Sequence, residues 1–405
     1  MVPMTDDLML AAPDEKTQAT AVVDFCAKSF GGYWGFTEYS RNGYILRSHY
    51  DWDASQIGMI RDKIVTHFGI WEYLCRIGGD TVKSGGIGVV CTDMRHRKRG
   101  YMADTTRASV ASMKRHGYHL SVLFGLSDFY DKFGYVDGWD SSEIRFKHSD
   151  LPNPNGKIKL KKYIYKKGSE IDALYNRSNK GLTGTAVRPT YGVNRRPSDW
   201  ECWKWTDDNG KVAGYIVCAL RNGRFSVVDW GGKADSVFAA ISTLLRKTQC
   251  SEVRINDVHE KSPLYRDLYS FNYRQETFHT RNGGCMIRVI NPSAFVGTIK
   301  KTLQKRLKSS AIADWTGTVK IQSPEETFFI TLRGKKIDVS ARPDSGTDTK
   351  HTIKTGFELA QLLVGVEEPE EIMRRSGMRA TGDAKAVVSA IFPHQHPSLG
   401  NWDHF

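Results

Sequence analysis

The sequence predicts an α/β protein built from more than one domain, and three observations support this. The chain has 405 residues, 40% of them hydrophobic, so it can bury more than one core. Stretches typical of strands alternate with stretches typical of helices along the first third. The composition changes after Pro152 and Pro154 and again near Pro292. We therefore expect domains at residues 1–150, 151–290 and 291–405.

The first domain contains a strand, a basic turn, a helix and a second strand. Segments 87–92 (IGVVCT) and 118–125 (YHLSVLFG) have strand character, and apolar residues recur at helical spacing between them. The helix is expected to start near Met102 and to end at Gly117. The turn Arg97-Lys98-Arg99-Gly100 then lies at the helix N-terminus, where backbone N–H groups bind anions. A site one helix end wide fits a pyrophosphate better than a polymer.

The middle domain repeats this order without the basic glycine turn. It begins with the alternating stretch KIKLKKYIYKK at 157–167, which predicts an edge strand. Strands at 214–220 and 224–230 are separated by a hairpin turn, and a helix at 236–247 leads to a strand that ends at Asn256. We expect a degenerate second copy of the first domain that has lost the phosphate site.

The last domain is predicted to be a third α/β unit. An amphipathic helix at 293–307 precedes alternating strands at 316–322, 327–332 and 336–339. Two further helices are expected at 357–364 and 369–376. The chain ends in PHQHPSLGNWDHF.

Charge and hydropathy limit the possible partners. The net charge is +13, and its excess lies in residues 151–290, which carry 24 Lys and Arg against 13 Asp and Glu. These charges are dispersed and accompany no RNA-binding or zinc-finger signature, so we expect a solvated basic face and no nucleic-acid partner. No stretch approaches the roughly 18 apolar residues of a membrane span, and the first residues are acidic. A cytoplasmic protein without a membrane partner is expected.

Cysteine and histidine spacing predicts neither a metal site nor a hydrolase. The seven cysteines are scattered without a C-x-x-C pair, and most are expected to be buried apolar residues. His394, His396 and His404 have no carboxylate or cysteine at a spacing that would complete a site. The chain also lacks G-x-S-x-G and H-E-x-x-H elements.

Two motifs resemble those of the GCN5-related N-acetyltransferases. Arg97-Lys98-Arg99-Gly100-Tyr101-Met102 occupies the place of that family's R/Q-x-x-G-x-G/A signature, with Met102 where glycine or alanine is usual. About 30 residues later, Phe129–Tyr135 (FYDKFGY) is similar to the family's FYxKxGF. The turn 96–100 (HRKRG), the length and the final Phe405 resemble the mycobacterial enhanced intracellular survival acetyltransferases. That resemblance implies tandem acetyltransferase domains, a C-terminal domain similar to sterol carrier proteins, and a hexamer.

The resemblance also implies acetyl-coenzyme A (acetyl-CoA) as co-substrate and assigns roles to particular residues. The strand before the turn is expected to hold the pantetheine arm and polarise the thioester through its backbone. Tyr130 is the implied general acid, since its reference pKa of about 10 lies near that of a thiol. The α-carboxylate of Phe405 is the implied group that acts on the amine. The residues expected to bind the coenzyme are Val90, Thr92, Arg97, Lys98, Arg99, Gly100, Met102 and Ser127.

Some of these residues keep a second interpretation. Trp34 and Phe36, in the glycine-rich GGYWGF, line the acceptor pocket or pack in the core. Ser127 contacts the coenzyme or caps a short helix over residues 128–133. Tyr130 either donates a proton or only packs against the strand.

The sequence thus predicts an N-acetyltransferase that acts on a primary amine of a small molecule, such as an aminoglycoside or a polyamine. Cys91 would face away from Val90 and Thr92, so we expect direct attack in a ternary complex and no acetyl-enzyme. One alternative acceptor is a protein lysine. An alternative of another class is a lipid-binding protein that uses its C-terminal domain. The identity of the acceptor is left open.

Overall fold

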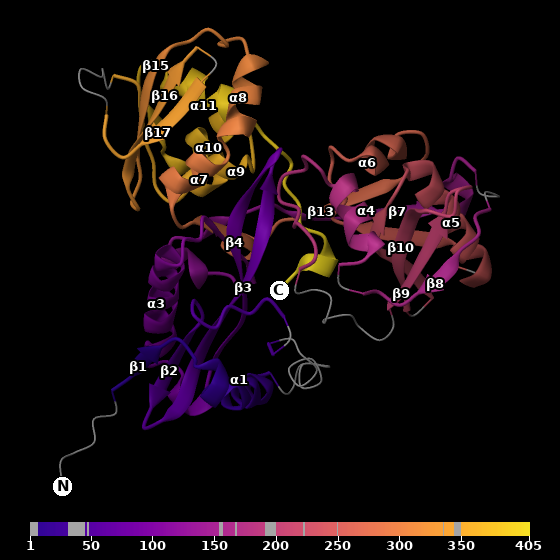
Figure 1. The fold of residues 1–405 in the computed structure, drawn as a ribbon, viewed down its shortest axis with the longest axis horizontal. Helices are drawn as coiled ribbons and strands as arrows, with labels where there is room; N and C mark the ends of the chain where they lie inside the picture. The colour runs from indigo at the N-terminus through magenta and orange to yellow at the C-terminus, as the bar shows by residue number, and fades with distance from the viewer. Residues whose placement is uncertain are drawn as a thin grey trace.

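The structure is a computed structural model with three lobes, each built around a β-sheet (Figure 1). The C-terminus lies at the centre, where the lobes meet. The structure describes residues 7–30, 45–46, 48–153, 157–166, 168–190, 200–221, 223–248, 250–334, 336–343 and 350–405. No helix in these ranges is long and apolar enough to cross a membrane.

The first sheet has the strand order β1-β2-β3-β4-β5-β14-β6. Its long hairpin of β3 and β4 turns at Gly78-Gly79, where Gly78 has a left-handed φ of 58°. Helices α1 and α3 pack on opposite faces of this sheet, because Ile70 joins the core under α3 and Trp71 the core under α1. The elements are β1 (Met9–Ala11), α1 (Glu15–Ser29), β2 (Gln56–Ile60), β3 (Lys63–Ile77), β4 (Asp80–Thr92), η1 (Met94–His96), α3 (Tyr101–Arg115), β5 (Leu120–Gly125), η2 (Tyr130–Phe133), β6 (Val136–Asp137) and β14 (Gly284–Val289).

The second sheet has the order β13-β7-β12-β11-β10-β9-β8, and the basic stretch forms its edge strand β8 as predicted. The other elements of this lobe include the strands and helix predicted between residues 214 and 256, in the expected order. They are β7 (Ser141–Lys147), η3 (His148–Asp150), β8 (Lys161–Tyr163), α4 (Glu170–Ser178), β9 (Trp200–Thr206), β10 (Val212–Arg221), β11 (Arg224–Gly231), α5 (Ala234–Thr248), β12 (Glu252–Asn256), α6 (Pro263–Leu268) and β13 (Arg274–Phe278).

The first two lobes exchange strands. β7 lies within residues 1–150, yet it pairs with β12 and β13 of the second sheet. β14 lies within residues 151–290, yet it pairs with β5 and β6 of the first sheet. The two lobes therefore share their connections at residues 138–140 and 279–283, and neither is a continuous stretch of chain.

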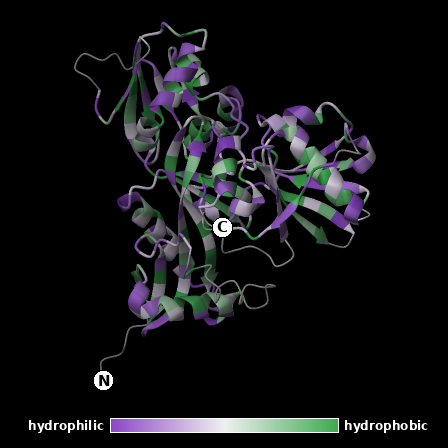
Figure 2. Cartoon of the chain, turned by 45° about the vertical axis from the view of Figure 1, so that its right-hand side comes forward, coloured by the Kyte–Doolittle hydropathy of each residue, from purple (hydrophilic) through white to green (hydrophobic). Residues whose placement is uncertain are grey.

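The third sheet has the order β17-β16-β15-β18-β19. The single helix predicted at 293–307 is divided in two, because the chain breaks its helical path at Ile299. The elements are α7 (Pro292–Thr298), α8 (Lys300–Lys308), β15 (Gly317–Gln322), β16 (Thr327–Arg333), β17 (Lys336–Ser340), β18 (Thr352–Lys354), α9 (Leu359–Val364), α10 (Pro369–Ser376), β19 (Arg379–Ala380), α11 (Ala384–Ile391) and η5 (Asn401–Asp403). Hydrophobic residues occur along strands of each lobe, and hydrophilic residues are common on the helices (Figure 2). This is the α/β architecture with three mixed sheets that the sequence predicts.

Candidate active site

Strands β4 and β5 part in the middle of the first sheet. Their parallel pairing runs from Ser84 opposite Leu120 to Ile87 opposite Leu123. Beyond this point the described part of β4 pairs with β3 alone, across a bulge. Val89, within the bulge, has a φ of 51°, which is strained for a β-branched residue. The parted strands leave backbone groups of β4 beyond Ile87 without a partner from β5.

A buried histidine holds the bulge from behind. The Nδ1 atom of His67 lies 2.8 Å from the carbonyl oxygen of Val89, and its Nε2 atom lies 2.8 Å from the hydroxyl of Tyr50. Burial lowers the pKa of His67 to about 4, so the ring is neutral at physiological pH. Because a carbonyl can only accept, Nδ1–H donates to Val89 and Nε2 accepts from Tyr50. His67 thereby fixes the shape of the strand at its strained residue.

The basic turn lies at the start of α3, as predicted. Gly100 has a φ of 82° and its carbonyl accepts from the N–H groups of Ala103 and Asp104. Apart from Gly100 itself and its two neighbours in the chain, no atom of the described residues lies within 4 Å of the position that a Cβ would take at Gly100. The side chains of Arg97, Lys98 and Arg99 are exposed. The first N–H groups of the helix therefore face open space next to three cations.

The turn tolerates a large residue at position 102 because the Met102 side chain points away from its outer surface. This side chain is partly buried against the core under α3, which includes Met113. It points into the protein, so the outer surface of the turn stays free. The turn is braced from the other side by Asp93, which accepts from the Arg95 N–H and lies 3.0 Å from His96 Nδ1. Slight burial alone would raise the pKa of Asp93, but these hydrogen bonds lower it to about 2.

Tyr130 lies in η2, against the last residue of β5. A Cβ at Gly125 would come within 2.6 Å of its ring, so only glycine allows this approach. Burial raises the pKa of Tyr130, and the hydroxyl therefore stays protonated and able to donate at physiological pH. Ser127 is exposed and does not cap η2, whose N-cap residue is Phe129. The helix-cap interpretation of Ser127 is therefore wrong.

The last residue of the chain packs onto β4. A Cβ at Gly86 would lie 2.2 Å from the ring of Phe405, so the ring occupies the space above this glycine. The centroid of the same ring lies 5.9 Å from that of Tyr73 on β3 and 5.6 Å from that of Phe124 on β5. Phe405 is only 8% exposed. The terminus is thus held across β3, β4 and β5, next to the point where the last two strands part.

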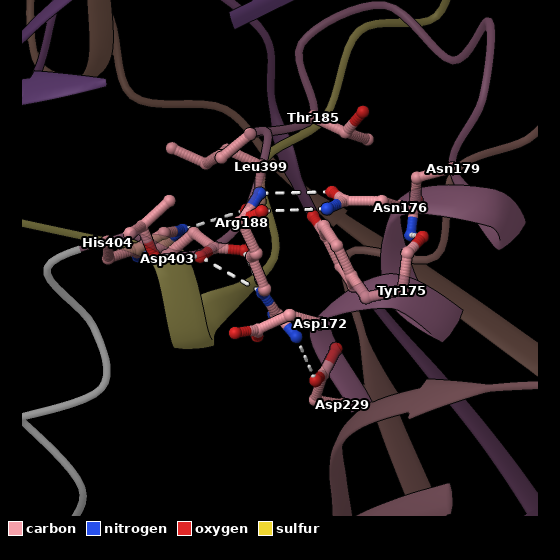
Figure 3. A network of polar contacts seen from close by, with 12 residues as sticks. Asp172, Tyr175, Asn176, Asn179, Thr185, Arg188, Asp229, Leu399, Asp403 and His404 are labelled. Atoms are coloured by element: carbon pink, nitrogen blue, oxygen red, sulfur yellow. Dashed lines mark hydrogen bonds and ion pairs between the residues drawn. The ribbon is translucent and has the colours of Figure 1, made fainter. Parts of the chain in front are cut away.

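A buried ionic network fixes the terminal segment to the second lobe (Figure 3). Asp403 accepts from Arg188 Nε at 3.1 Å and from Arg188 Nη2 at 2.9 Å, and its other oxygen accepts from the Thr190 hydroxyl at 2.6 Å. Arg188 also donates from Nη1 to Asp229 at 2.6 Å. The side chains of Arg188 and Asp403 are 1% and 0% exposed. Such a pair, with its hydrogen bonds satisfied, is costly to break.

The arginine is itself held in place. Its guanidinium stacks on Tyr175, 3.5 Å from the ring centroid, and the Asn176 side chain bonds both its backbone N–H and its carbonyl oxygen. Burial opposes the charge of Arg188, but Asp229 and Asp403 outweigh it and raise its pKa. The second lobe therefore positions the residue two places before the chain end.

One cavity is lined in part by residues that contact the terminal segment and another by the segment itself, and both carry carboxylates. One of about 660 Å³ is lined by Tyr73 with Asp51, Asp53 and Glu72. The other, of about 240 Å³, is lined by residues of the shared connections and of the terminal segment, among them Asp140 and His404, and also by Phe124, Asp137 and Asp257. Burial raises the pKa of Asp257 to about 6 and also raises that of Asp137.

The family of the first lobe is decided by sequence comparison. Residues 15–136 match the family model described as the acetyltransferase (GNAT) domain. The chain carries a GNAT acetyltransferase domain. It contains both motifs, since the match ends just after the FYDKFGY segment.

The whole chain shares its fold with solved structures of similar length. A GCN5-related N-acetyltransferase from Kribbella flavida has a TM-score of 0.72 at 17% identity, covering 99% of both chains. Another from Anabaena variabilis has a TM-score of 0.74 at 16% identity, covering 97% of this chain and 99% of that one. Eis1 from Mycobacterium abscessus has a TM-score of 0.67 at 13% identity, covering 98% of this chain and all of that one. No curated protein matches the chain.

The GNAT domain implies acetyl-CoA, and the described residues fit this molecule. The backbone of β4 beyond Ile87 is available to an extended arm, and Gly100 leaves room for phosphates beside exposed cations. Cys91 is buried in the core on the α1 side, whereas Val90 packs on the α3 side. Val90 and Thr92 therefore face away from Cys91, as the strand pattern predicts.

Trp34 and Phe36 lie outside the described residues. The rings of His394 and His396 stack at 3.8 Å, but His404 stacks on Phe124 instead, with ring centroids 3.9 Å apart. The three histidines therefore do not form one site. The residues that sequence reasoning missed are His67 and Arg188, which act through contacts with residues far along the chain.

Proposed function

We propose that the protein is an acetyl-CoA-dependent N-acetyltransferase that acetylates a primary amine of a small molecule by direct attack in a ternary complex. The proposal is carried by the packing of Phe405 on Gly86, beside the parted strands of the GNAT domain. Acetyl-CoA supplies the activated acetyl group. The chain's own residues bind it, orient the amine and move two protons.

The phosphate turn and β4 have the binding role. Exposed N–H groups at the start of α3, with Arg97, Lys98 and Arg99, would hold the pyrophosphate. Backbone groups at Val90 and Thr92 would hold the arm and face the thioester oxygen. Tyr130 would donate its proton to the departing sulfur, because burial keeps the hydroxyl protonated at physiological pH; the same burial raises its pKa further above that of a thiol, so the transfer is less balanced than for an ordinary tyrosine.

The terminal carboxylate would orient the amine. Its reference pKa of about 3.5 is too low to take a proton directly from an ammonium near 10. We therefore assign it a hydrogen bond to the amine and the passage of the proton through water. The ring packing of Phe405 and the Arg188–Asp403 pair support this role by fixing where the chain ends.

Carboxylates around the terminus favour a cationic acceptor such as an aminoglycoside or polyamine. Asp51, Asp53 and Glu72 line one cavity, although Lys83, which pairs with Glu72, and Arg188 line it too, and Asp137 and Asp140 line the other. A protein lysine remains the alternative acceptor. The alternative of another class is lipid binding by the C-terminal domain, whose likeness to sterol carrier proteins is a prediction. A cytoplasmic hexamer is proposed on the resemblance alone.

Thiol release from acetyl-CoA tests the proposal. We would compare aminoglycosides, polyamines and lysine peptides as acceptors for the intact chain, for Tyr130→Phe and for a chain lacking Phe405. One small-amine class should support activity, which should fall at least about tenfold in both variants. Activity with lysine peptides alone would favour the protein acceptor, and none with any amine would favour lipid binding. Full activity without Phe405 would remove the terminal carboxylate from the mechanism.

A further inference from the structure

A cluster of metal-ligating side chains, which includes His67, lies behind β4 on the α1 side of the first sheet. Cys26 comes from α1, His67 from β3 and Cys91 from β4. One ligand atom of each lies within 4.8 Å of the other two. In a tetrahedral zinc site, two sulfurs at about 2.3 Å from the metal are about 3.8 Å apart, so side-chain adjustments of about 1 Å would close the set.

We propose that Cys26, His67 and Cys91 bind one divalent transition-metal ion, with Zn²⁺ as the best-fitting species. The donor set is two sulfurs and one imidazole nitrogen. Sulfur and nitrogen donors select zinc or cobalt over magnesium and calcium, which prefer oxygen.

The hydrogen bonds of His67 match those of a metal-binding histidine. Its Nδ1–H donates to the Val89 carbonyl at 2.8 Å, and a ligating imidazole commonly donates its other N–H to a backbone carbonyl. This leaves the lone pair on Nε2 for the ion. The Tyr50 hydroxyl now lies 2.8 Å from Nε2, so its oxygen is the natural fourth ligand once the ion takes the lone pair.

Charge balance favours a divalent ion in this position. Cys26 and His67 are fully buried, and Cys91 and Tyr50 nearly so, in a core that includes Val22 and Trp71. Binding replaces two S–H bonds by two metal–sulfur bonds and releases two protons to solvent. The product, one divalent cation with two thiolates, a neutral imidazole and a neutral phenol, carries no net charge. A neutral complex can lie in an apolar core without the cost of a buried charge.

The proposed ion has a structural role. It links α1 to β3 and β4 directly behind Val89, the strained residue where β4 leaves β5. Protein groups fill all four positions, which is typical of structural zinc sites and leaves no place for a substrate. Metal loading should therefore stiffen the strand that we assign to acetyl-CoA without taking part in the chemistry.

Cobalt spectroscopy on the untagged, reduced full chain tests this proposal. Adding Co²⁺ to metal-stripped protein should produce the visible absorption of tetrahedral thiolate-bound cobalt, saturating at one ion per chain, and Zn²⁺ should displace it. Cys26→Ser and Cys91→Ser should each abolish or strongly weaken the signal. Cys250→Ser is the matched control, since Cys250 lies in the second lobe outside the cluster, and it should bind as the parent does.

Thermal unfolding gives a second measurement that does not depend on activity. Zinc in excess should raise the melting temperature of the parent by about 5 °C and leave the doubly substituted Cys26→Ala/Cys91→Ala chain unchanged. The proposal is overturned if the parent gives no thiolate–cobalt absorption, or if the signal survives in both single cysteine variants. Equal zinc shifts in the parent and the double variant would also overturn it. Because the double variant keeps apolar side chains in the core, it remains informative if a serine variant fails to fold.

Discussion

Asp257 shows how burial at a single residue makes stability depend on pH. It follows β12 with a left-handed φ of 53°, and its Oδ1 accepts from the Ser142 N–H at 3.0 Å. Burial nevertheless raises the pKa of the carboxyl to about 6, from an ordinary value of 3.8. The folded protein therefore binds this proton more tightly than the unfolded chain does, and ionised Asp257 destabilises the fold.

Asp257→Asn should consequently stabilise the protein at pH 8 by about 2 kcal/mol and have little effect at pH 4. Asparagine keeps the oxygen that accepts from Ser142 and tolerates the left-handed backbone. As pH rises from 4 through 6, the Asp257 carboxyl ionises in the unfolded chain before it ionises in the folded protein, so the folded protein loses stability. Asp257→Asn removes this loss. Urea unfolding midpoints at the two pH values measure the effect, with the exposed Asp338→Asn as control. Equal stabilisation at both pH values would contradict the burial argument.

The sequence identified the residues whose role depends on local conformation. Gly100 was predicted at a helix start because its turn precedes a clear amphipathic pattern, and the positive φ confirms that the position needs glycine. His67 and Arg188 could not be found in this way. Each is a single polar residue in an unremarkable stretch, and its partners come from strands or termini far along the chain.

At the scale of the element, the start of α3 was predicted within one residue of the observed one. Of the hairpin formed by β3 and β4, only the last part of β4, residues 87–92, was predicted. The signal was present, since Gly78-Gly79 separates two apolar stretches as in a tight hairpin. The bulge at Val89 had no signal, because valine normally avoids that conformation and only the surrounding contacts impose it.

Strand β4 also offers a test of the terminal residue. In Gly86→Ala the new Cβ would overlap the Phe405 ring, at 2.2 Å, and the chain end is the part free to move. We expect acetyl transfer to fall at least about tenfold in kcat while the fold is kept, as for other lost proton-transfer groups. Steady-state kinetics measure kcat, and circular dichroism shows whether the fold is kept.

Gly297→Ala is the matched control for this change. Gly297 lies in α7, and apart from its chain neighbours and the helix's own backbone no described atom comes within 4 Å of the position that the alanine Cβ would take. It should retain full activity. If Gly86→Ala were as active as this control, the position of Phe405 above β4 would not matter to the reaction.

On the scale of the whole molecule, the lobes depend on one another. β7 and β14 cross between the first two sheets, and the terminal segment passes from the third lobe to the second lobe before Phe405 packs on the first. Local patterns predicted the three α/β units, but strand exchange leaves no local pattern. It joins segments such as 120–125 and 284–289, which each read as ordinary strands.

The second lobe, which lacks the glycine turn, holds the chain end in place, and under the proposed function this gives it a task in the reaction. Asp403→Lys puts a cation against buried Arg188, so the terminal segment should leave its place while Asp229 still pairs with the arginine. Carboxypeptidase should then release Phe405 at least about tenfold faster, because a frayed terminus is open to proteolysis. The kcat should fall as far as it does without Phe405, although the carboxylate is still present. Asp338→Lys, on exposed β17, is the matched control. A protected and active terminus in Asp403→Lys would show that the ring packing of Phe405 suffices to hold it.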